Sequence, residues 1–199
     1  MGTGNHYSAA MPESAFVLQE TKKVAQLMID HDDRDEVRAI VHDDNLLNVK
    51  TLSNEEKIFS FMYRRLDLIS DDLKRIIIDG DDADARFVNL ISIMKLDNLF
   101  REFVFETYYD CLRSKDPVTD FEIMSFYEKK GREDETVASW RDSTLGKLKN
   151  RYTRILFAAG LVKKQIGVRE ISTPFIGRMT LDLLRKEGYS DYIKATLGI

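Results

Sequence analysis

The chain has 199 residues, of which 43% are hydrophobic and 32% charged, and its net charge is −4 at pH 7. This length suits one or two small domains, and the apolar content is enough for a buried core. No apolar run approaches the roughly 20 residues that span a bilayer, and residues 1–10 lack the basic and apolar regions of a signal peptide. Cys111 is the single cysteine, which excludes a disulfide framework and a thiolate zinc site. We therefore expect a cytoplasmic protein without a membrane segment, with Cys111 in the core.

The first part of the chain reads as a tail followed by a helical bundle. Small and polar residues over 1–13 predict a flexible tail. Apolar residues then recur at helical spacing as far as residue 116. The predicted helices cover 14–30, 33–41, 53–69, 70–80, 82–94 and 97–111, with N-caps at Ser14, Asp33, Ser53, Ser70 and Asp97. Lys115, Asp116 and Pro117 interrupt the pattern, which predicts a domain boundary there.

The second part, residues 117–199, begins with another series of helices. Thr119 and Glu122 have the spacing of a capping box before a helix over 120–130, and a short helix is expected over 134–140. A later helix is expected to open at Thr173 and Pro174 and to end at Gly188, followed by a last one over 190–197. The inner face of the helix after Pro174 is predicted to hold Ile176, Met179, Thr180, Leu183 and Leu184.

The stretch 140–160 carries the strongest functional signal. One face is apolar, with Leu145, Leu148, Tyr152, Ile155, Leu156 and Ala159 at helical spacing. Lys147, Asn150, Arg151 and Arg154 follow the i, i+3, i+4, i+7 pattern on another face. Ser143 is a suitable N-cap, and Gly160 suits the position after the helix that takes a positive φ.

After Gly160 the helical spacing of the apolar residues ends. Residues 161–166 and 168–172 are short runs rich in β-branched residues, which predicts a small hairpin around Gly167 that carries Lys163, Lys164 and Arg169. Helix, short helix, basic helix and hairpin is the order of a winged helix-turn-helix, in which the third helix enters the DNA major groove. We therefore predict a mostly all-α protein with two helical subdomains, 14–116 and 117–199, the second one winged-helix-like with a small β-hairpin.

The charge distribution supports an anion-binding C-terminal part. Residues 137–199 hold 12 Lys+Arg and 5 Asp+Glu, a balance of +7, whereas residues 1–136 hold 18 and 29, a balance of −11. Such asymmetry between the two parts indicates an anion-facing C-terminal part and an acidic N-terminal part. A solvated helix face is the alternative explanation for a basic stripe.

No catalytic constellation is recognisable. The three histidines His6, His31 and His42 lie within the first 42 residues, and His31 with Asp32 and Asp33 matches no metal-site spacing. There is no P-loop, dinucleotide-binding glycine motif or nucleophile elbow. We expect no catalytic residues, no bound metal, no cofactor, no small-molecule substrate and no enzymatic activity.

Several stretches together resemble the BrxA family, the small helical component of BREX bacteriophage-defence systems. The resemblance rests on Trp140, Asp142 to Leu145, Lys147 and residues 159–162, with support from 14–29, 45–66 and 97–108, so it covers most of the chain. It implies a helical, non-enzymatic protein that binds double-stranded DNA in the bacterial cytoplasm. It also implies that a methyltransferase, an ATPase and a phosphatase-like protein act beside it.

The leading hypothesis is a non-enzymatic subunit that binds double-stranded DNA. Its DNA contacts are predicted at Ser143, Thr144, Lys147, Asn150, Arg151, Arg154, Lys163, Lys164 and Arg169. The cationic residues would bind phosphates, whereas Ser143, Thr144 and Asn150 would bond backbone or base edges. Three alternatives stay open: a protein-interaction adaptor of the same system, a winged-helix transcriptional regulator and an RNA binder.

Overall fold

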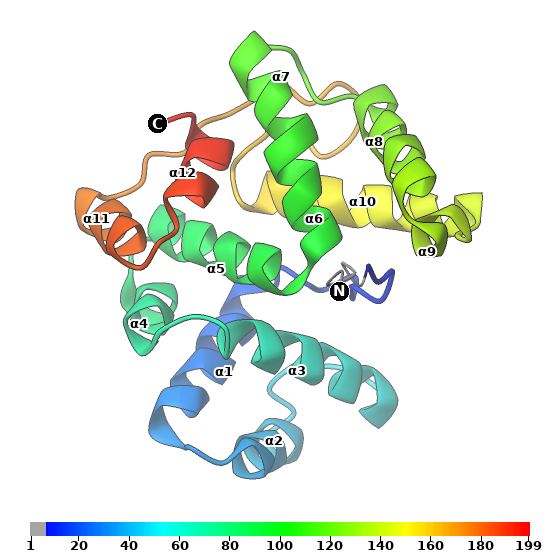
Figure 1. Cartoon of the computed structure of the whole chain (residues 1–199). Helices are drawn as coiled ribbons and strands as arrows, with labels where there is room; N and C mark the ends of the chain where they lie inside the picture. Colours follow the sequence, from blue (N-terminus) through cyan, green and yellow to red (C-terminus); the bar gives the residue numbers. More distant parts are fainter. Residues whose placement is uncertain (1–6) are drawn as a thin grey trace, which may run out of the picture. The chain divides into compact units, whose positions relative to one another are not determined.

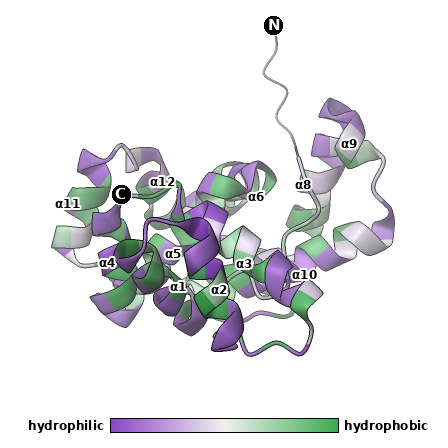
Figure 2. Ribbon diagram, turned by 90° about the horizontal axis from the view of Figure 1, so that it is seen from below, coloured by the Kyte–Doolittle hydropathy of each residue, from purple (hydrophilic) through white to green (hydrophobic). Residues whose placement is uncertain are grey.

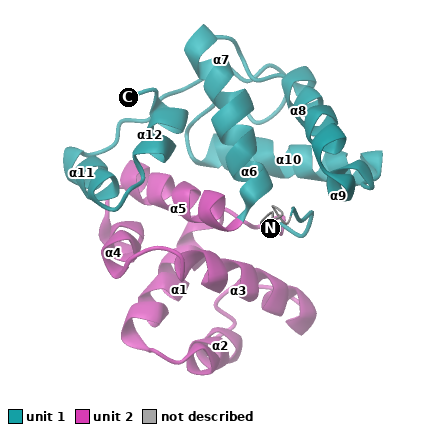
Figure 3. Ribbon diagram, viewed as in Figure 1, with its two compact units in different colours: residues 1–11, 97–199 teal, residues 12–96 magenta. Residues whose placement is uncertain are grey.

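The computed structural model describes residues 7–199 and is built from helices (Figure 1). Over this range there is no named strand, so the prediction of an all-α fold is confirmed. The chain divides into two compact units (Figure 3): unit 1 comprises residues 1–11 and 97–199, and unit 2 comprises residues 12–96. The helices of both units mix hydrophilic and hydrophobic residues along their length (Figure 2), as expected where one face is buried.

Unit 2 is a bundle of five helices. They are α1 (Leu18–Asp30), α2 (Arg34–Asp43), α3 (Leu52–Leu66), α4 (Asp71–Asp79) and α5 (Asp82–Leu96). Helix α1 packs against α2, α3, α4 and α5. Residues 87–94 of α5 are all buried, so this helix is the centre of the unit 2 core.

Two predicted helix starts of unit 2 are confirmed, and in both the side chain of the N-cap residue accepts a hydrogen bond from a backbone amide. Asp33 accepts hydrogen bonds from the amides of Asp35 and Glu36, and Ser70 accepts one from Leu73, as predicted. The caps predicted at Ser14 and Ser53 are wrong. Residues before α1 form a turn, in which the Val17 amide bonds the Ser14 carbonyl, and α3 already starts after Thr51.

Arg65 is a fully buried polar residue of unit 2 that the sequence did not single out. Its guanidinium donates to the side-chain oxygens of Asn89, Ser92 and Thr21, the latter two at 2.7 Å. Because these partners are neutral, burial lowers the pKa of Arg65 to about 9. The bonds link α1, α3 and α5 through one side chain.

In unit 1, residues 97–199 form one long helical column followed by a series of separate helices, among them the basic helix. The column is α6 (Asn98–Phe103), a π-helical segment η1 (Val104–Tyr108) and α7 (Tyr109–Ser114). It is followed by α8 (Asp120–Glu133), α9 (Glu135–Ala138), α10 (Asp142–Ala158), α11 (Arg178–Lys186) and α12 (Ser190–Leu197). The break at Pro117 thus lies inside unit 1, whereas the sequence placed the domain boundary there.

An aromatic cluster explains why the column groups with the later helices. Phe100 and Phe103 of α6 lie 4.8 Å and 5.3 Å, between ring centroids, from Tyr152 of α10. Phe126 and Tyr127 of α8 complete the cluster, at 5.5 Å from Phe103 and 5.8 Å from Tyr152. Burial of five aromatic rings stabilises the packing of α6, α8 and α10, since such side chains dominate core energetics.

The β-hairpin predicted around Gly167 is wrong. The segment 161–172 forms one isolated antiparallel bridge, Val162 to Ile171, and no strand. The pairing stops there because the Arg169 backbone bonds Val118 instead, in a second isolated bridge. The Arg169 Nε also donates to the Gln165 carbonyl at 2.9 Å, which bends the chain before a strand can form. We call residues 161–172 the bridge loop.

Two further expectations fail at the ends of unit 1. The helix predicted from Thr173 starts only at Arg178, after a segment without regular secondary structure, and Met179 of its predicted inner face is 88% exposed. Within the predicted tail 1–13, residues 1–6 lie outside the described residues. Tyr7 and Met11 are buried, and the Tyr7 hydroxyl donates to Glu102 Oε2 at 2.7 Å.

Candidate nucleic-acid interface

The basic helix α10 has a well-defined end. The Gly160 amide bonds the Phe157 carbonyl at 3.0 Å, and the Leu161 amide bonds the Leu156 carbonyl at 2.9 Å. This pair of bonds is a Schellman motif, and it needs the positive φ of 76° that Gly160 adopts. The predicted start is wrong, because the helix begins at Asp142 after Arg141 and Ser143 lies inside its first turn.

The two predicted faces of α10 separate in the structure. Leu148, Tyr152, Ile155 and Leu156 are buried, which confirms the apolar face. On the opposite side Ser143, Lys147, Asn150 and Arg154 are exposed, and Thr144 beside them is half-buried. The four exposed residues follow helical spacing, and we call them the α10 stripe. From Ser143 to Arg154 it extends over about 16 Å at the helical rise of about 1.5 Å per residue.

Arg151 lies outside the α10 stripe, contrary to the sequence expectation that it faces outward. Its side chain is half-buried and donates from NH1 to the Ala9 carbonyl at 3.2 Å. Its Nε is buried without a hydrogen-bond partner. The aromatic cluster and residues 7–11 thus occupy this side of α10, so Arg151 contributes to the packing of unit 1.

Arg169 is also not available as a phosphate contact. Its side chain is 4% exposed and donates to Asp120 Oδ1 at 2.8 Å and to the Val118 carbonyl at 3.3 Å. Lys149, which is not among the predicted DNA contacts, pairs with the other Asp120 oxygen. These two hydrogen bonds, that of Lys149 foremost, lower the pKa of Asp120, so this carboxylate stays charged and fixes the bridge loop and α10 to the start of α8.

The remaining two predicted contacts, Lys163 and Lys164, are exposed on the bridge loop. Lys163 forms a solvent-exposed ion pair with Glu170 at 2.9 Å. The tip of the loop is apolar, with Ile166 82% exposed and Val168 59% exposed. The loop therefore offers cations at its base and a hydrophobic tip that the sequence pattern did not predict.

The arrangement can bind an anionic surface. Lys147 and Arg154 are two exposed cationic residues on α10, whose opposite side packs into the aromatic cluster through Tyr152. Asn150 lies between them and can donate and accept hydrogen bonds. Cations on a rigid helix favour phosphate groups, because the side chains lose little backbone freedom on binding.

The metal-ligating side chains, the single thiol and the hydropathy of the helices can be described over residues 7–199. Within residues 7–199 no group of three or more His, Cys, Asp or Glu side chains is placed to hold a metal ion. Cys111 is buried in the core, as predicted, and burial raises the pKa of its thiol to about 11. None of the helices in this range combines the length and the apolar character that a bilayer crossing requires.

Comparison with known proteins identifies the family. The chain is 34% identical over 193 residues to the BREX protein BrxA of Bacillus cereus (strain H3081.97), and the match covers 96% of each chain. The fold is similar to the crystal structure of an uncharacterized protein from Magnetospirillum magneticum, with a TM-score of 0.82, 21% identity and coverage of 96% of this chain and 98% of that chain. The BrxA family model matches residues 5–188, and the chain therefore belongs to the BrxA family.

Proposed function

We propose that this member of the BrxA family is a non-enzymatic component of a BREX bacteriophage-defence system that binds double-stranded DNA through unit 1. The relative from Bacillus cereus is named as a BREX protein, which supports the assignment to such a system. The observation that carries the DNA-binding part is the α10 stripe, in which Lys147 and Arg154 are exposed on one side of a helix whose other side is buried.

The proposed interface is smaller than the sequence suggested. Lys147, Asn150 and Arg154 form its centre, with Ser143 and Thr144 at the start of the helix and Lys163 and Lys164 on the bridge loop. Arg151 and Arg169 support it from inside unit 1. With about four cationic contacts, the logarithm of the affinity should fall with the logarithm of the salt concentration with a slope of about −4.

Fluorescence anisotropy with a labelled DNA duplex at several salt concentrations tests the proposal. The double variant Lys147→Ala, Arg154→Ala should weaken binding for all duplex sequences and reduce the salt slope by about two. Lys186 and Lys194 are exposed on α11 and α12, so the double variant Lys186→Ala, Lys194→Ala makes the same change in net charge. It should leave duplex binding almost unchanged.

Equal duplex affinity of the two double variants would refute the assignment of α10 to DNA. Single-stranded DNA and RNA of the same length, measured in parallel, separate a duplex binder from an RNA binder. Replacement of Asn150 by Ala reports on base reading: a sequence-reading regulator loses preference at one position, whereas a backbone binder does not.

The exposed apolar residues support a second candidate function, a protein-interaction adaptor of the same system. Ile166 and Val168 project from the bridge loop, and Phe175 and Met179 are 88% exposed further along. Large exposed apolar residues mark protein interfaces when they lie together. Replacement of Ile166 and Val168 by Ser should then abolish co-purification with another BREX protein while duplex affinity stays unchanged.

A further inference from the structure

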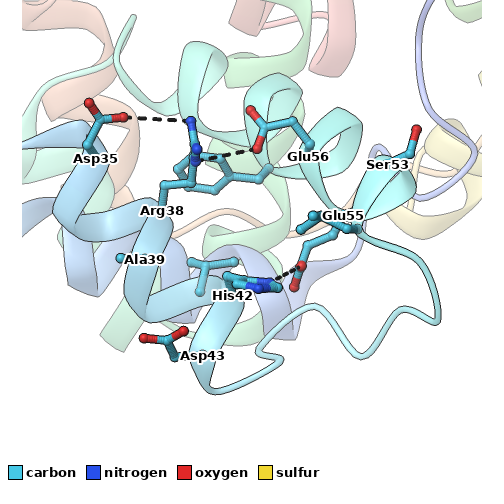
Figure 4. Close-up of a pocket in the computed structure, with 11 residues that line it drawn as sticks. Asp35, Arg38, Ala39, His42, Asp43, Ser53, Glu55 and Glu56 are labelled. Atoms are coloured by element: carbon cyan, nitrogen blue, oxygen red, sulfur yellow. Dashed lines mark hydrogen bonds and ion pairs between the residues drawn. The ribbon is translucent and has the colours of Figure 1, made fainter.

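A pocket opens in unit 2 between α2 and α3 (Figure 4). Its volume is about 770 Å³. This lies within the range of roughly 300–1,000 Å³ that is typical of sites for small ligands or side-chain anchors. The pocket is formed by the neighbouring turns of α2 from Asp35 to Asp43 and of α3 from Leu52 to Phe59.

The pocket contains a buried carboxylate with one unsatisfied oxygen. Glu55 is 7% exposed, and its Oε2 lies 3.0 Å from Nδ1 of His42, which donates because a carboxylate can only accept. The other oxygen, Oε1, is buried and has no hydrogen-bond partner. A buried acceptor without a donor is costly, so the site gains free energy when a ligand supplies one. The exposed His42 ring, which lies beside Glu55 in Figure 4, can move aside to admit it.

The charge of the lining residues selects a cation. Asp35, Asp43, Glu55 and Glu56 contribute four negative charges, and Arg38 contributes one positive charge, which leaves −3 with His42 neutral. The Arg38 guanidinium does not neutralise its neighbours closely, since it lies 3.7 Å from Glu56 and 3.8 Å from Asp35 in solvent-exposed pairs. A concave surface of one sign concentrates its field on the opposite charge.

The apolar part of the lining adds a second requirement. Val41 and Phe59 are buried at the wall of the pocket, and Leu52, also part of the lining, is 63% exposed. A ligand that matches both parts has a cationic head on an aliphatic stem, as lysine and arginine side chains do. Because Leu52 is exposed and the pocket is large, the favoured ligand is a chain segment that covers this surface, rather than a small free amine.

We infer that this pocket binds a lysine or arginine side chain from a basic, partly apolar segment of a partner protein. The cationic head donates to Glu55 and Glu56, and the aliphatic stem packs on Leu52, Val41 and Phe59. The inference concerns unit 2 and does not depend on DNA binding by α10. It assigns to the acidic part of the chain the recognition of a cationic side chain of a partner protein.

Titration of the full chain with a fluorescent peptide of alternating lysine and leucine tests this inference. Glu55→Gln keeps the shape and the acceptor to His42 but removes the charge, so binding should weaken about tenfold, as for loss of a hydrogen bond to a charged group. Asp79→Asn makes the same charge change at an exposed residue at the end of α4, and it should bind the peptide as the unmodified chain does. Glu56→Gln, at a half-exposed position, should also weaken binding and does not place the core at risk.

Three results would overturn the inference. The first is equal peptide affinity for Glu55→Gln, Glu56→Gln and Asp79→Asn. The second is equal binding of a matched peptide of alternating glutamate and leucine. The third is displacement of the lysine peptide by spermidine at concentrations below those of the peptide itself, which would identify the site as one for a small polyamine. A thermal melt of each variant confirms that it is folded in the titration.

Discussion

Arg169 of the bridge loop and Asp120 at the start of α8 form a salt bridge in which the guanidinium is buried and the carboxylate is half-exposed. The nitrogen NH2 of Arg169 lies 2.8 Å from Asp120 Oδ1, although 48 residues separate the two positions in the chain. The same guanidinium donates to the carbonyl of the fully buried Val118. A residue that the sequence suggested as a DNA contact is therefore part of the framework that holds the bridge loop.

Replacement of Arg169 by Ala should destabilise the protein by about 2–3 kcal/mol, because the Gln165 carbonyl and Asp120 lose a donor and the Val118 carbonyl keeps only the Arg169 backbone amide. Lys163→Ala, which breaks an exposed ion pair on the same loop, should cost roughly 0.5 kcal/mol or less. Chemical denaturation of both variants measures the difference. Equal stability of the two variants would contradict the framework role of Arg169.

Asp97 predicts a pH dependence of stability. It caps α6 through a 2.8 Å bond from the Phe100 amide, and burial raises its pKa from 3.8 to about 6. Between these two values the unfolded chain has lost the proton while the folded chain keeps it, so the contribution of Asp97 to stability falls as pH rises from 3.8 to about 6 and stays low above. Asn caps equally well and carries no charge.

Asp97→Asn should therefore stabilise the protein above about pH 7 by on the order of 2 kcal/mol, and have almost no effect below about pH 4. Denaturation curves at several pH values measure this difference. A stability change that is the same at both ends of the pH range would show that the charge of Asp97 plays no part in it.

Replacement of two glycines by alanine, one inside α10 and one after its end, should change the stability of the protein in opposite directions. Gly160→Ala should destabilise by about 1 kcal/mol, because φ is 76° there and the strain lies in the backbone: the new Cβ would meet Pro174 only at an ordinary 3.7 Å. Gly146→Ala, inside the helix with open space around the new Cβ, should stabilise by about 0.5–1 kcal/mol. Thermal melts of the pair test the assignment of the helix end, and a stabilising Gly160→Ala would refute it.

Cys111 should be unreactive in the folded protein. Its thiol is buried, and burial, with the nearby carboxylates of Glu122, Asp116 and Asp110 as smaller causes, raises its pKa to about 11. At about pH 8 the thiolate that reacts with alkylating reagents is therefore scarce and shielded. Labelling with iodoacetamide should follow unfolding by denaturant. Rapid modification without denaturant would place Cys111 at the surface.

Local sequence patterns predicted most of the helices but not their packing partners. Helix caps that depend on one side chain, such as those at Asp33, Ser70 and Thr119, could be predicted from local sequence. Asp33 and Ser70 accept the expected amide hydrogen bonds, and Thr119 forms the predicted capping box with Glu122. The bridge loop could not be predicted in this way. Its β-branched residues favour strands, yet pairing of Arg169 with Val118 is a contact across 51 residues that no local pattern contains.

The candidate interface shows the same limit. Periodicity correctly placed Lys147, Asn150 and Arg154 on one side of α10, since that depends only on helical geometry. Arg151 lies just beside this stripe, and its half-buried side chain donates to the Ala9 carbonyl, 142 residues away in the chain. Glu55 was missed because it lies between the exposed Asn54 and the half-exposed Glu56, where a buried charge has no local signature.

The π-helical segment Val104–Tyr108 gives unit 1 one place where its helical column can lose a residue. A π-turn accommodates one residue more than an α-turn, so loss of a single residue here would let the column close as regular α-helix. The residues beyond it would keep their orientation relative to α6, because the π-turn had absorbed the extra residue. Tyr108 could then still donate from its hydroxyl to the Leu161 carbonyl, at 3.1 Å in the intact chain. Deletion of Val104 or Phe105 should therefore be tolerated better than a single-residue deletion in α6 or α7, which would rotate the rest of the column by about 100°.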